Sequence, residues 1–392
     1  MPVVNRIAEL AAEAAAWRRD LHAHPELGFD VHRTADFVAR KLREFGVDEI
    51  ATGIGRTGVV GVIRGRGRAS GRVVALRADM DALPIEEAAD VPFRSTVPGR
   101  MHACGHDGHT AMLLCAARYL AETRNFDGDA VVIFQPAEET GGGGGEMVRD
   151  GVMERFGVQE VYGLHNMPGI PVGSFAIRPG AIMAAADSFQ ITIEGRGGHA
   201  AMPHRCLDPV LVAAHVITAL QGIVSREVDP LEAAVITVAS VKAGETTNVI
   251  PQTATLLGTC RTLREDVRDM CERRIGEAVS GICAAFGAQG ALDYRRGYPV
   301  TVNDPARAAF MADMAAQIAG EARVERNVAP MMGAEDFSFM LNARPGAYIF
   351  VGNGEGPMVH HPAYRFDDDA IPHGASLWAR LVETAMPLGK AA

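Results

Sequence analysis

The sequence predicts an α/β protein with a mixed, largely parallel sheet, helices on both faces of that sheet, and a smaller α+β domain inserted into it. Short apolar runs alternate with helical patterns at first, the pattern changes near Asp187, and the first pattern returns after Tyr298. Such alternation is typical of parallel sheets covered by helices. A chain of 392 residues is also long enough for two domains.

The larger domain is expected to comprise residues 1–185 and 298–392. It opens with an amphipathic helical pattern near the N-terminus. Apolar runs and helical patterns then follow in turn: strands within 72–84, 129–139 and 161–168, a helix within 109–122, a strand within 346–354 and a final helix within 374–386.

The inserted domain is expected to span residues 186–297. Its patterns come in a βαββαβ order: strand 187–197, helix 207–226, strands 233–244 and 253–262, helix 264–287 and strand 291–298. That order is typical of a split βαβ sandwich.

Composition excludes several classes of protein. The formal net charge of -10 and the isoelectric point near 5.7 leave no basic face for nucleic acid or for an anionic membrane. No run approaches the ~18 apolar residues that a membrane span needs. The N-terminus lacks a secretory pattern, and six scattered cysteines do not suggest disulfides, so we expect a soluble, cytoplasmic protein.

Carboxylates and imidazoles follow four of the expected strands. Because ligands bind beyond the carboxyl ends of strands in open α/β sheets, we expect these side chains to converge with the stretch "MHACGHDGH", residues 101–109. Each of them alone has an ordinary explanation, such as a helix cap, a solvated loop or a packed histidine. The residues concerned are Asp79, Asp81, Glu138, Glu139, His165, His360 and His361.

The donor types indicate a metal centre. Thiolate, imidazole and carboxylate together suit borderline divalent ions such as zinc or manganese, and two such ions can share a bridging ligand and support hydrolysis. The chain has no C-x-x-C, which argues against a zinc finger or a zinc deaminase. The glycine run 141–145 lacks the G-K-S/T of a phosphate-binding loop and is interpreted as a flexible connection.

Ordered motifs over essentially the whole chain resemble the aminoacylase and carboxypeptidase family of dinuclear metallopeptidases. The nearest subgroup is that of hippurate hydrolases and plant auxin-conjugate amidohydrolases. The motifs include "LRADMDALPIEE", "MHACGHDGHTAMLL", "FQPAEE", "GLHNMP", "GRGGHAAMPH", "TNVIPQTATLLGTCRT", "GAEDFSFM" and "HHPAYRFDDDAIPHGA". The segment Tyr364-Arg365-Phe366-Asp367-Asp368 departs from the subgroup's usual Y-D-F-N-D, which puts only pocket detail in doubt.

The resemblance implies a role for each candidate residue. Glu138 matches the general base, and Asp81 matches a carboxylate that orients a metal ligand. His199 matches a histidine that reaches the partner subunit's metal site and polarises the scissile carbonyl. The implied metal ligands are Cys104 as the bridging thiolate, His106, Glu139, His165 and His360, with His361 as the alternative to His360. Asn248 and Arg261 match residues that hold the carboxylate of the substrate.

The implied activity is metal-dependent hydrolysis of N-acyl amino acids, hippurate-like or N-acetylated, to a carboxylic acid and a free amino acid. A metallo-carboxypeptidase or dipeptidase is the alternative enzyme, and a non-catalytic binding protein on the same scaffold is the alternative from another class. Two divalent ions per subunit are expected, manganese or zinc, with cobalt or nickel as alternatives. The inserted domain is expected to act as a lid and dimerisation domain in a homodimer or tetramer.

Overall fold

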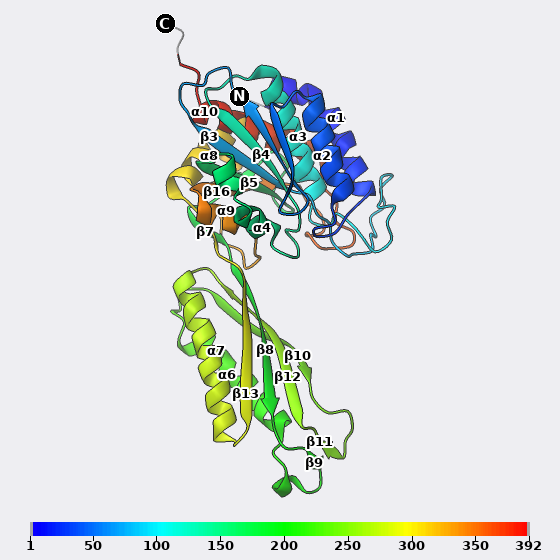
Figure 1. Cartoon of the computed structure of the whole chain (residues 1–392), viewed down its shortest axis with the longest axis vertical. Coiled ribbons are helices and arrows are strands. Elements are labelled where there is room, and N and C mark those ends of the chain that lie inside the picture. The colour runs from blue at the N-terminus through cyan, green and yellow to red at the C-terminus, as the bar shows by residue number, and fades with distance from the viewer. Residues whose placement is uncertain (1–2, 390–392) are drawn as a thin grey trace. The chain divides into compact units, whose positions relative to one another are not determined.

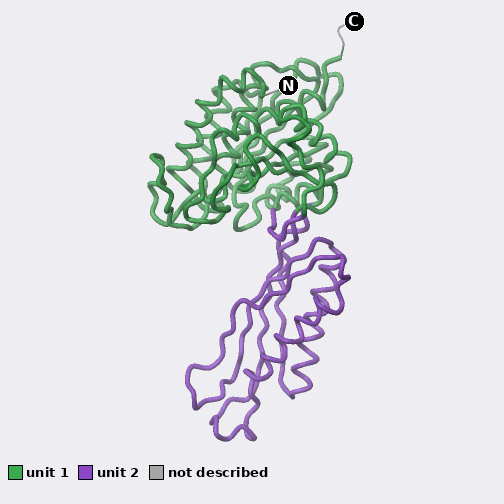
Figure 2. The backbone as a smooth tube through the Cα atoms, turned by 180° about the vertical axis from the view of Figure 1, so that it is seen from behind, with its two compact units in different colours: residues 1–182, 302–329, 336–392 green, residues 183–301, 330–335 purple. Residues whose placement is uncertain are grey.

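A computed structural model describes residues 3–389 and divides the chain into two compact units (Figure 2). Unit 1 comprises Met1–Ile182, Val302–Ala329 and Asp336–Ala392. Unit 2 comprises Met183–Thr301 and Pro330–Glu335. The sequence pattern predicts the inserted domain at residues 186–297, and it does not predict that the short segment 330–335 belongs to the same unit.

Unit 1 is built on an eight-stranded mixed sheet with the strand order β1-β2-β4-β3-β5-β16-β6-β15. Its four central strands are parallel to one another. The antiparallel pairs β1 with β2, β2 with β4 and β6 with β16 flank this centre. The strands are β1 (Glu49–Ile54), β2 (Gly58–Arg64), β3 (Val73–Asp79), β4 (Asp129–Gln135), β5 (Glu160–Met167), β6 (Phe175–Ala176), β15 (Val324–Glu325) and β16 (Gly346–Gly352).

Helices cover both faces of this sheet, as the sequence predicted. Five helices pack against one another and against one face of the sheet. They are α1 (Asn5–Ala23), α2 (His32–Glu44), α3 (His106–Thr123), α8 (Pro305–Ala319) and α10 (Ile371–Ala385). Shorter helices gather around α4 (Gly143–Arg149), namely α5 (Val152–Arg155) and α9 (Ser338–Ala343) (Figure 1).

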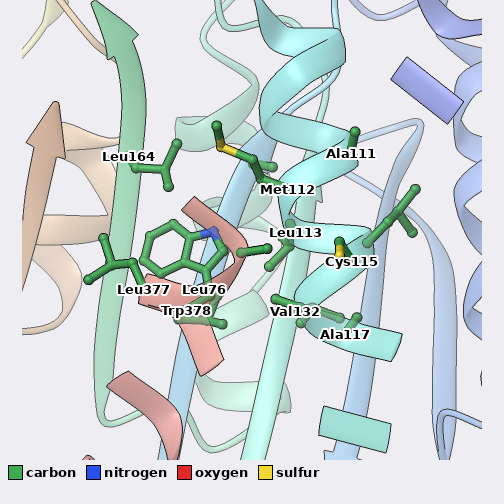
Figure 3. Close-up of a cluster of buried hydrophobic side chains, with 14 of the residues drawn as sticks. Leu76, Ala111, Met112, Leu113, Cys115, Ala117, Val132, Leu164, Leu377 and Trp378 are labelled. Atoms are coloured by element: carbon green, nitrogen blue, oxygen red, sulfur yellow. The ribbon is translucent and has the colours of Figure 1, made fainter. Parts of the chain in front are cut away.

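The main core lies between the sheet and the α1-α3-α10 layer. Figure 3 shows Trp378 of α10 among Leu76, Leu164 and Met112, all of them fully or almost fully buried. Because side chains alternate along a strand, the neighbours of these core residues point to the other face. Those neighbours include Arg77 and His165, so the polar groups of the sheet and its largest core are kept apart.

Unit 2 has the predicted βαββαβ order. Its antiparallel sheet runs β10-β12-β8-β13, and its two long helices bury a second core on one face of that sheet. The elements are β8 (Ala185–Glu194), α6 (Pro209–Arg226), β10 (Ala234–Lys242), β12 (Thr253–Thr262), α7 (Glu265–Ala285) and β13 (Gln289–Tyr298). A two-residue pair, β9 (Gly198–His199) with β11 (Val249–Ile250), lies at one end of the unit (Figure 1). The small strands β7 (Gly180–Met183) and β14 (Thr301–Asn303) pair where the chain passes between the units.

By length and composition alone, α6 could cross a membrane, and it is the one such helix among residues 3–389. One-third of its apolar window is buried, and Val216 and Leu220 pack into the core of unit 2. Core helices of ordinary domains pass the same test, so this is weak evidence for a membrane span.

Candidate metal centre

The four central parallel strands bring the candidate residues to one edge of the sheet. Asp79 ends β3, His165 lies near the end of β5, and Glu138 follows β4 by three residues. His360 follows β16, which pairs with β5 in parallel register. Since all four strands run in the same direction, their carboxyl ends meet at one edge, as the sequence pattern predicted.

The stretch that contains Cys104 and His106 forms the turn into α3. Gly105 caps this helix with a φ of +86°, a conformation that other residues adopt only under strain. A Cβ there would lie 2.3 Å from the side-chain nitrogen of Asn166 and 2.6 Å from the hydroxyl of Tyr364. Glycine therefore lets both neighbours approach the backbone between the two candidate ligands.

The glycine run after Glu139 is not the flexible connection that its composition suggested. Gly143 begins α4, and a Cβ on it would lie 1.8 Å from the carbonyl oxygen of Pro136. The backbone N–H of Gly144 donates to the Asp336 carboxylate at 2.7 Å. Close packing, not mobility, explains why these positions lack side chains.

Asp81 orients three of the candidate residues at once. Its carboxylate accepts the backbone N–H groups of Glu138 at 2.9 Å and Glu139 at 3.1 Å. Its carbonyl oxygen accepts the Nδ1–H of His106 at 2.8 Å, which turns Nε2 of that ring toward the site. Burial raises the pKa of the Asp81 carboxyl despite the hydrogen bond to His106.

The candidate ligand atoms lie within reach of shared ions. Cys104 Sγ is 3.3 Å from His165 Nε2, and Glu139 Oε1 is 3.3 Å from His360 Nε2 and 3.9 Å from His106 Nε2. Five groups of three described residues could each surround an ion, and three of them are built around candidate ligands: Cys104 with His106 and His165, Cys104 with Glu139 and His360, and His106 with Glu138 and Glu139. The structure brings together all five residues proposed as ligands.

Two backbone outliers mark the same place. Ala137, just before Glu138, has a φ of +54°, and His360 has a φ of +68°. Residues other than glycine adopt such angles at a cost of order 1–3 kcal/mol. The two other described residues of this kind, Arg56 and Arg124, lie elsewhere, and Arg124 caps the end of α3. The His360 backbone N–H donates to the Ala103 carbonyl at 2.8 Å, which ties this ring to the turn that carries Cys104. His361 makes its ring contact with the N–H of Ala363 instead.

The donor set fits metal ions. His106 Nε2 and Glu139 Oε1 are buried and have no hydrogen-bond partner among the described residues. Burial, together with the nearby carboxylates Glu139 and Glu138, raises the pKa of the Cys104 thiol well above its ordinary value. A thiol in such surroundings becomes a thiolate only when cations offset those charges, and bound divalent ions would also satisfy the two orphaned atoms.

A buried cluster of charged residues around Asp107 packs against the start of α3. Asp107 follows His106 and contacts His22 Nδ1 at 2.9 Å and Arg18 at 3.4 Å. His22 also contacts Glu87 at 3.1 Å. Burial disfavours the charged ring, but the hydrogen bonds to Asp107 and Glu87 outweigh it and raise the pKa of His22 to about 9.

The three candidate residues of unit 2 do not lie together. His199 pairs with Val249 between β9 and β11, and the Asn248 carbonyl accepts the N–H of Ala200 at 3.0 Å, so His199 and Asn248 are neighbours. Arg261 is eight residues along β12 from Thr253, where that strand begins, a distance of about 26 Å at the rise of a strand. Within one copy of unit 2, Arg261 is therefore far from both His199 and Asn248.

Sequence patterns missed several side chains that contact the site. Asn166 and Tyr364 touch the Cys104 turn, and Arg77 contacts both Asp79 and Asp336. Asp336 donates its backbone N–H to Glu138 Oε1 at 3.4 Å. All four residues lie within the motifs quoted for the resemblance, but a lone arginine, amide, tyrosine or distant carboxylate gives no signal of its own.

Comparison with known proteins identifies the family. Residues 75–384 match the model of Peptidase family M20/M25/M40. The chain belongs to this family. It is 41% identical over 381 residues to a hippurate hydrolase from Campylobacter jejuni, covering 97% of this chain and 98% of that relative.

Two further members of this family bear on the site and its substrate. Thermostable carboxypeptidase 2 from Saccharolobus solfataricus is 40% identical over 395 residues, which cover 97% of this chain and 98% of the relative. The crystal structure of the YXEP protein from Bacillus subtilis, described as a dinuclear metal binding peptidase, aligns with a TM-score of 0.85 and 33% identity. That alignment covers 97% of this chain and 99% of the other.

The His22 cluster predicts a pH dependence of stability. A charged His22 stabilises the fold fully below pH 6.5, and this contribution is lost as the pH rises through about 9, because the folded protein keeps a proton that the unfolded chain releases. The difference in unfolding free energy between wild type and His22→Gln should therefore shrink by on the order of 3 kcal/mol over that range.

Urea unfolding at a series of pH values measures this difference. His32→Gln, which removes an exposed histidine at the start of α2, serves as the control and should follow the wild type. Parallel curves for wild type and His22→Gln would show that His22 does not hold its proton in the folded state.

Proposed function

We propose that this protein hydrolyses the amide bond of N-acyl amino acids and releases a carboxylic acid and a free amino acid. The observation that carries the proposal is the convergence of Cys104, His106, Glu139, His165 and His360 with Glu138 beside them. The similarity over almost the full length to a hippurate hydrolase, whose name denotes an N-acyl amino acid substrate, supports this substrate class.

Two divalent ions per subunit complete the site in this proposal. Cys104 would bridge them, with His106, Glu139, His165 and His360 as the remaining ligands. Such ions supply Lewis-acid polarisation of the carbonyl and a lowered pKa of water. We propose manganese or zinc as the physiological metal, with cobalt or nickel as alternatives, because the donor set mixes sulfur, nitrogen and oxygen.

Glu138 is the proposed general base. The Asp81 carboxylate fixes its backbone, and the N–H of Asp336 donates to its Oε1. In the proposed reaction this carboxylate takes the proton of the attacking water, holds it, and passes it to the nitrogen of the leaving amino acid. The side chain is almost wholly buried, so bulk water competes little for that proton.

Asn248 and Arg261 are the proposed substrate-binding residues, and His199 is a proposed catalytic residue. Arg261 suits the planar carboxylate of the substrate. Because His199 and Asn248 lie together at one end of unit 2 and Arg261 lies far along β12, we propose that His199 and Asn248 act on a partner subunit's site. In this role His199 would donate to the developing oxyanion, and unit 2 would act as the lid and dimerisation domain of a homodimer or a tetramer.

The alternative enzyme is a carboxypeptidase or dipeptidase. The 40% identity to a thermostable carboxypeptidase favours it specifically. An N-acyl amino acid and a peptide both have an amide bond next to a free carboxylate, and they differ in whether an acyl group or a peptide precedes that bond.

We also propose a cytoplasmic location, since all six cysteines are free.

Glu138→Gln should retain both metals and lose nearly all turnover of an N-acyl amino acid. General acid and base catalysis contributes about 10²- to 10⁴-fold, and glutamine cannot accept the proton. Elemental analysis and initial rates on N-benzoyl and N-acetyl amino acids, with dipeptides as the competing class, measure both properties. A variant that keeps more than about a tenth of the wild-type rate would exclude Glu138 as the base.

Cys104→Ala should lower metal occupancy, because the bridging donor is lost. Cys115→Ala is the matched control, since Cys115 lies on the same helix, α3, but within the apolar core (Figure 3). Elemental analysis after dialysis against a fixed free metal concentration should separate the two. Full occupancy in Cys104→Ala would exclude a thiolate bridge.

His199→Ala should retain both metals and lose about 10²- to 10³-fold in turnover, the usual effect of removing one oxyanion donor. When it is mixed with Glu138→Gln under subunit exchange, some heterodimers acquire one site with both wild-type residues. Activity should then recover in the mixture. Heterodimers that form without recovery, or a fully active monomer, would rule out action across subunits.

A further inference from the structure

The ring of His109 has hydrogen-bond partners on both of its nitrogens. Nδ1 contacts Asp79 Oδ1 at 2.7 Å, and Nε2 receives the backbone N–H of Asn166 at 2.9 Å. The side-chain amide of Asn166 lies 3.0 Å from the same Nε2. A backbone N–H can only donate, so Nε2 accepts, and the ring hydrogen must lie on Nδ1, facing Asp79.

Asn166 passes this restraint to both sides of the site. Its side-chain amide donates to the backbone carbonyl oxygen of Cys104 at 2.6 Å, and its own backbone carbonyl oxygen accepts the Nδ1–H of the preceding His165 at 2.6 Å. The Tyr364 hydroxyl donates to its side-chain oxygen at 2.7 Å. Asn166 thus contacts the backbone of one proposed ligand and the ring of another.

Asp79 is itself held in one orientation. Arg77, which is fully buried, contacts Asp79 Oδ2 at 2.8 Å and leaves Oδ1 toward His109. Because the backbone N–H of Asn166 occupies Nε2, the hydrogen of His109 lies on Nδ1 and is donated to Asp79 Oδ1.

We propose that His109 is a positioning residue that, held between Asp79 at Nδ1 and Asn166 at Nε2, sets the separation of Cys104 Sγ and His165 Nε2 through Asn166. The inference rests on the metal ligands proposed above. It also keeps His109 out of the ligand set, although one of its ring nitrogens lies close enough to Asp79 and His106 for the three to surround an ion. Partners that orient metal ligands typically change metal affinity by about 10- to 100-fold when they are altered.

Three substitutions separate positioning from ligation and from packing. His109→Leu removes the acceptor for the Asn166 amide. His109→Gln offers an oxygen that can accept it. Asp79→Asn keeps the shape but, with its oxygen facing Arg77, presents an N–H₂ to His109, which would force the ring hydrogen onto Nε2 against the N–H of Asn166. Cys115→Ala, within the same helix, controls for lost packing.

Titration of the metal-free full-length protein with Co²⁺ provides the readout, together with the thiolate-to-cobalt absorption band. His109→Leu and Asp79→Asn should each weaken Co²⁺ binding by about 10- to 100-fold and shift that band. His109→Gln should recover most of the affinity while still binding two ions, and Cys115→Ala should match the wild type. Nitrogen-15 NMR of the His109 ring in the metal-free protein should show the Nδ1–H tautomer.

Other results would overturn the proposal. Wild-type affinity and spectrum in His109→Leu or Asp79→Asn would exclude positioning. A His109→Gln protein that binds one ion fewer would make His109 a ligand, and an equal loss in Cys115→Ala would reduce the effect to packing. If Cys104→Ala and Glu139→Gln also bound Co²⁺ like the wild type, the ligand set of the proposed function would fail instead.

Discussion

The site depends on a fully buried guanidinium. Arg77 contacts Asp79 at 2.8 Å and Asp336 at 3.0 Å, and its Nε donates to Gln135 at 2.8 Å. Several ionisable carboxyl groups lie close together here, and burying like charges without partners costs far more free energy than a fold can supply. Arg77 balances the charges of Asp79 and Asp336. The charge of Glu139 is left for metal ions to balance.

The carboxylates that bind protein donors therefore have a different role from the atoms that are left for metal ions. Groups bonded to Arg77 or to other protein donors hold the backbone, as Asp336 holds Gly144 and Asp81 holds the two glutamates. His106 Nε2 and Glu139 Oε1, which make no well-aligned hydrogen bond to any described residue, lie 3.9 Å apart, and His360 Nε2 lies 3.3 Å from the same Glu139 oxygen.

The sequence predicted the parts of this structure that depend on periodicity and on strand ends. The parallel strands, the βαββαβ unit and the convergence of Asp79, Glu138, His165 and His360 all follow from apolar patterns and from where polar residues interrupt them. Asn166 and Arg77 were not predicted, because each lies within an apolar strand and acquires its role only from contacts with distant residues. The separation of Arg261 from Asn248 was hidden because thirteen positions in sequence say nothing about which ends of a strand they occupy.

The glycine run beside Glu139 has a consequence for protein engineering. To a designer who works from composition, five consecutive glycines resemble a linker into which a tag, a loop or a sensor domain could be inserted. Here Gly143 leaves no room for a methyl group next to Pro136, and Gly144 packs against the backbone of Asp336. We expect insertions to be tolerated better in the loop around Leu231 in unit 2, where this residue is 94% exposed.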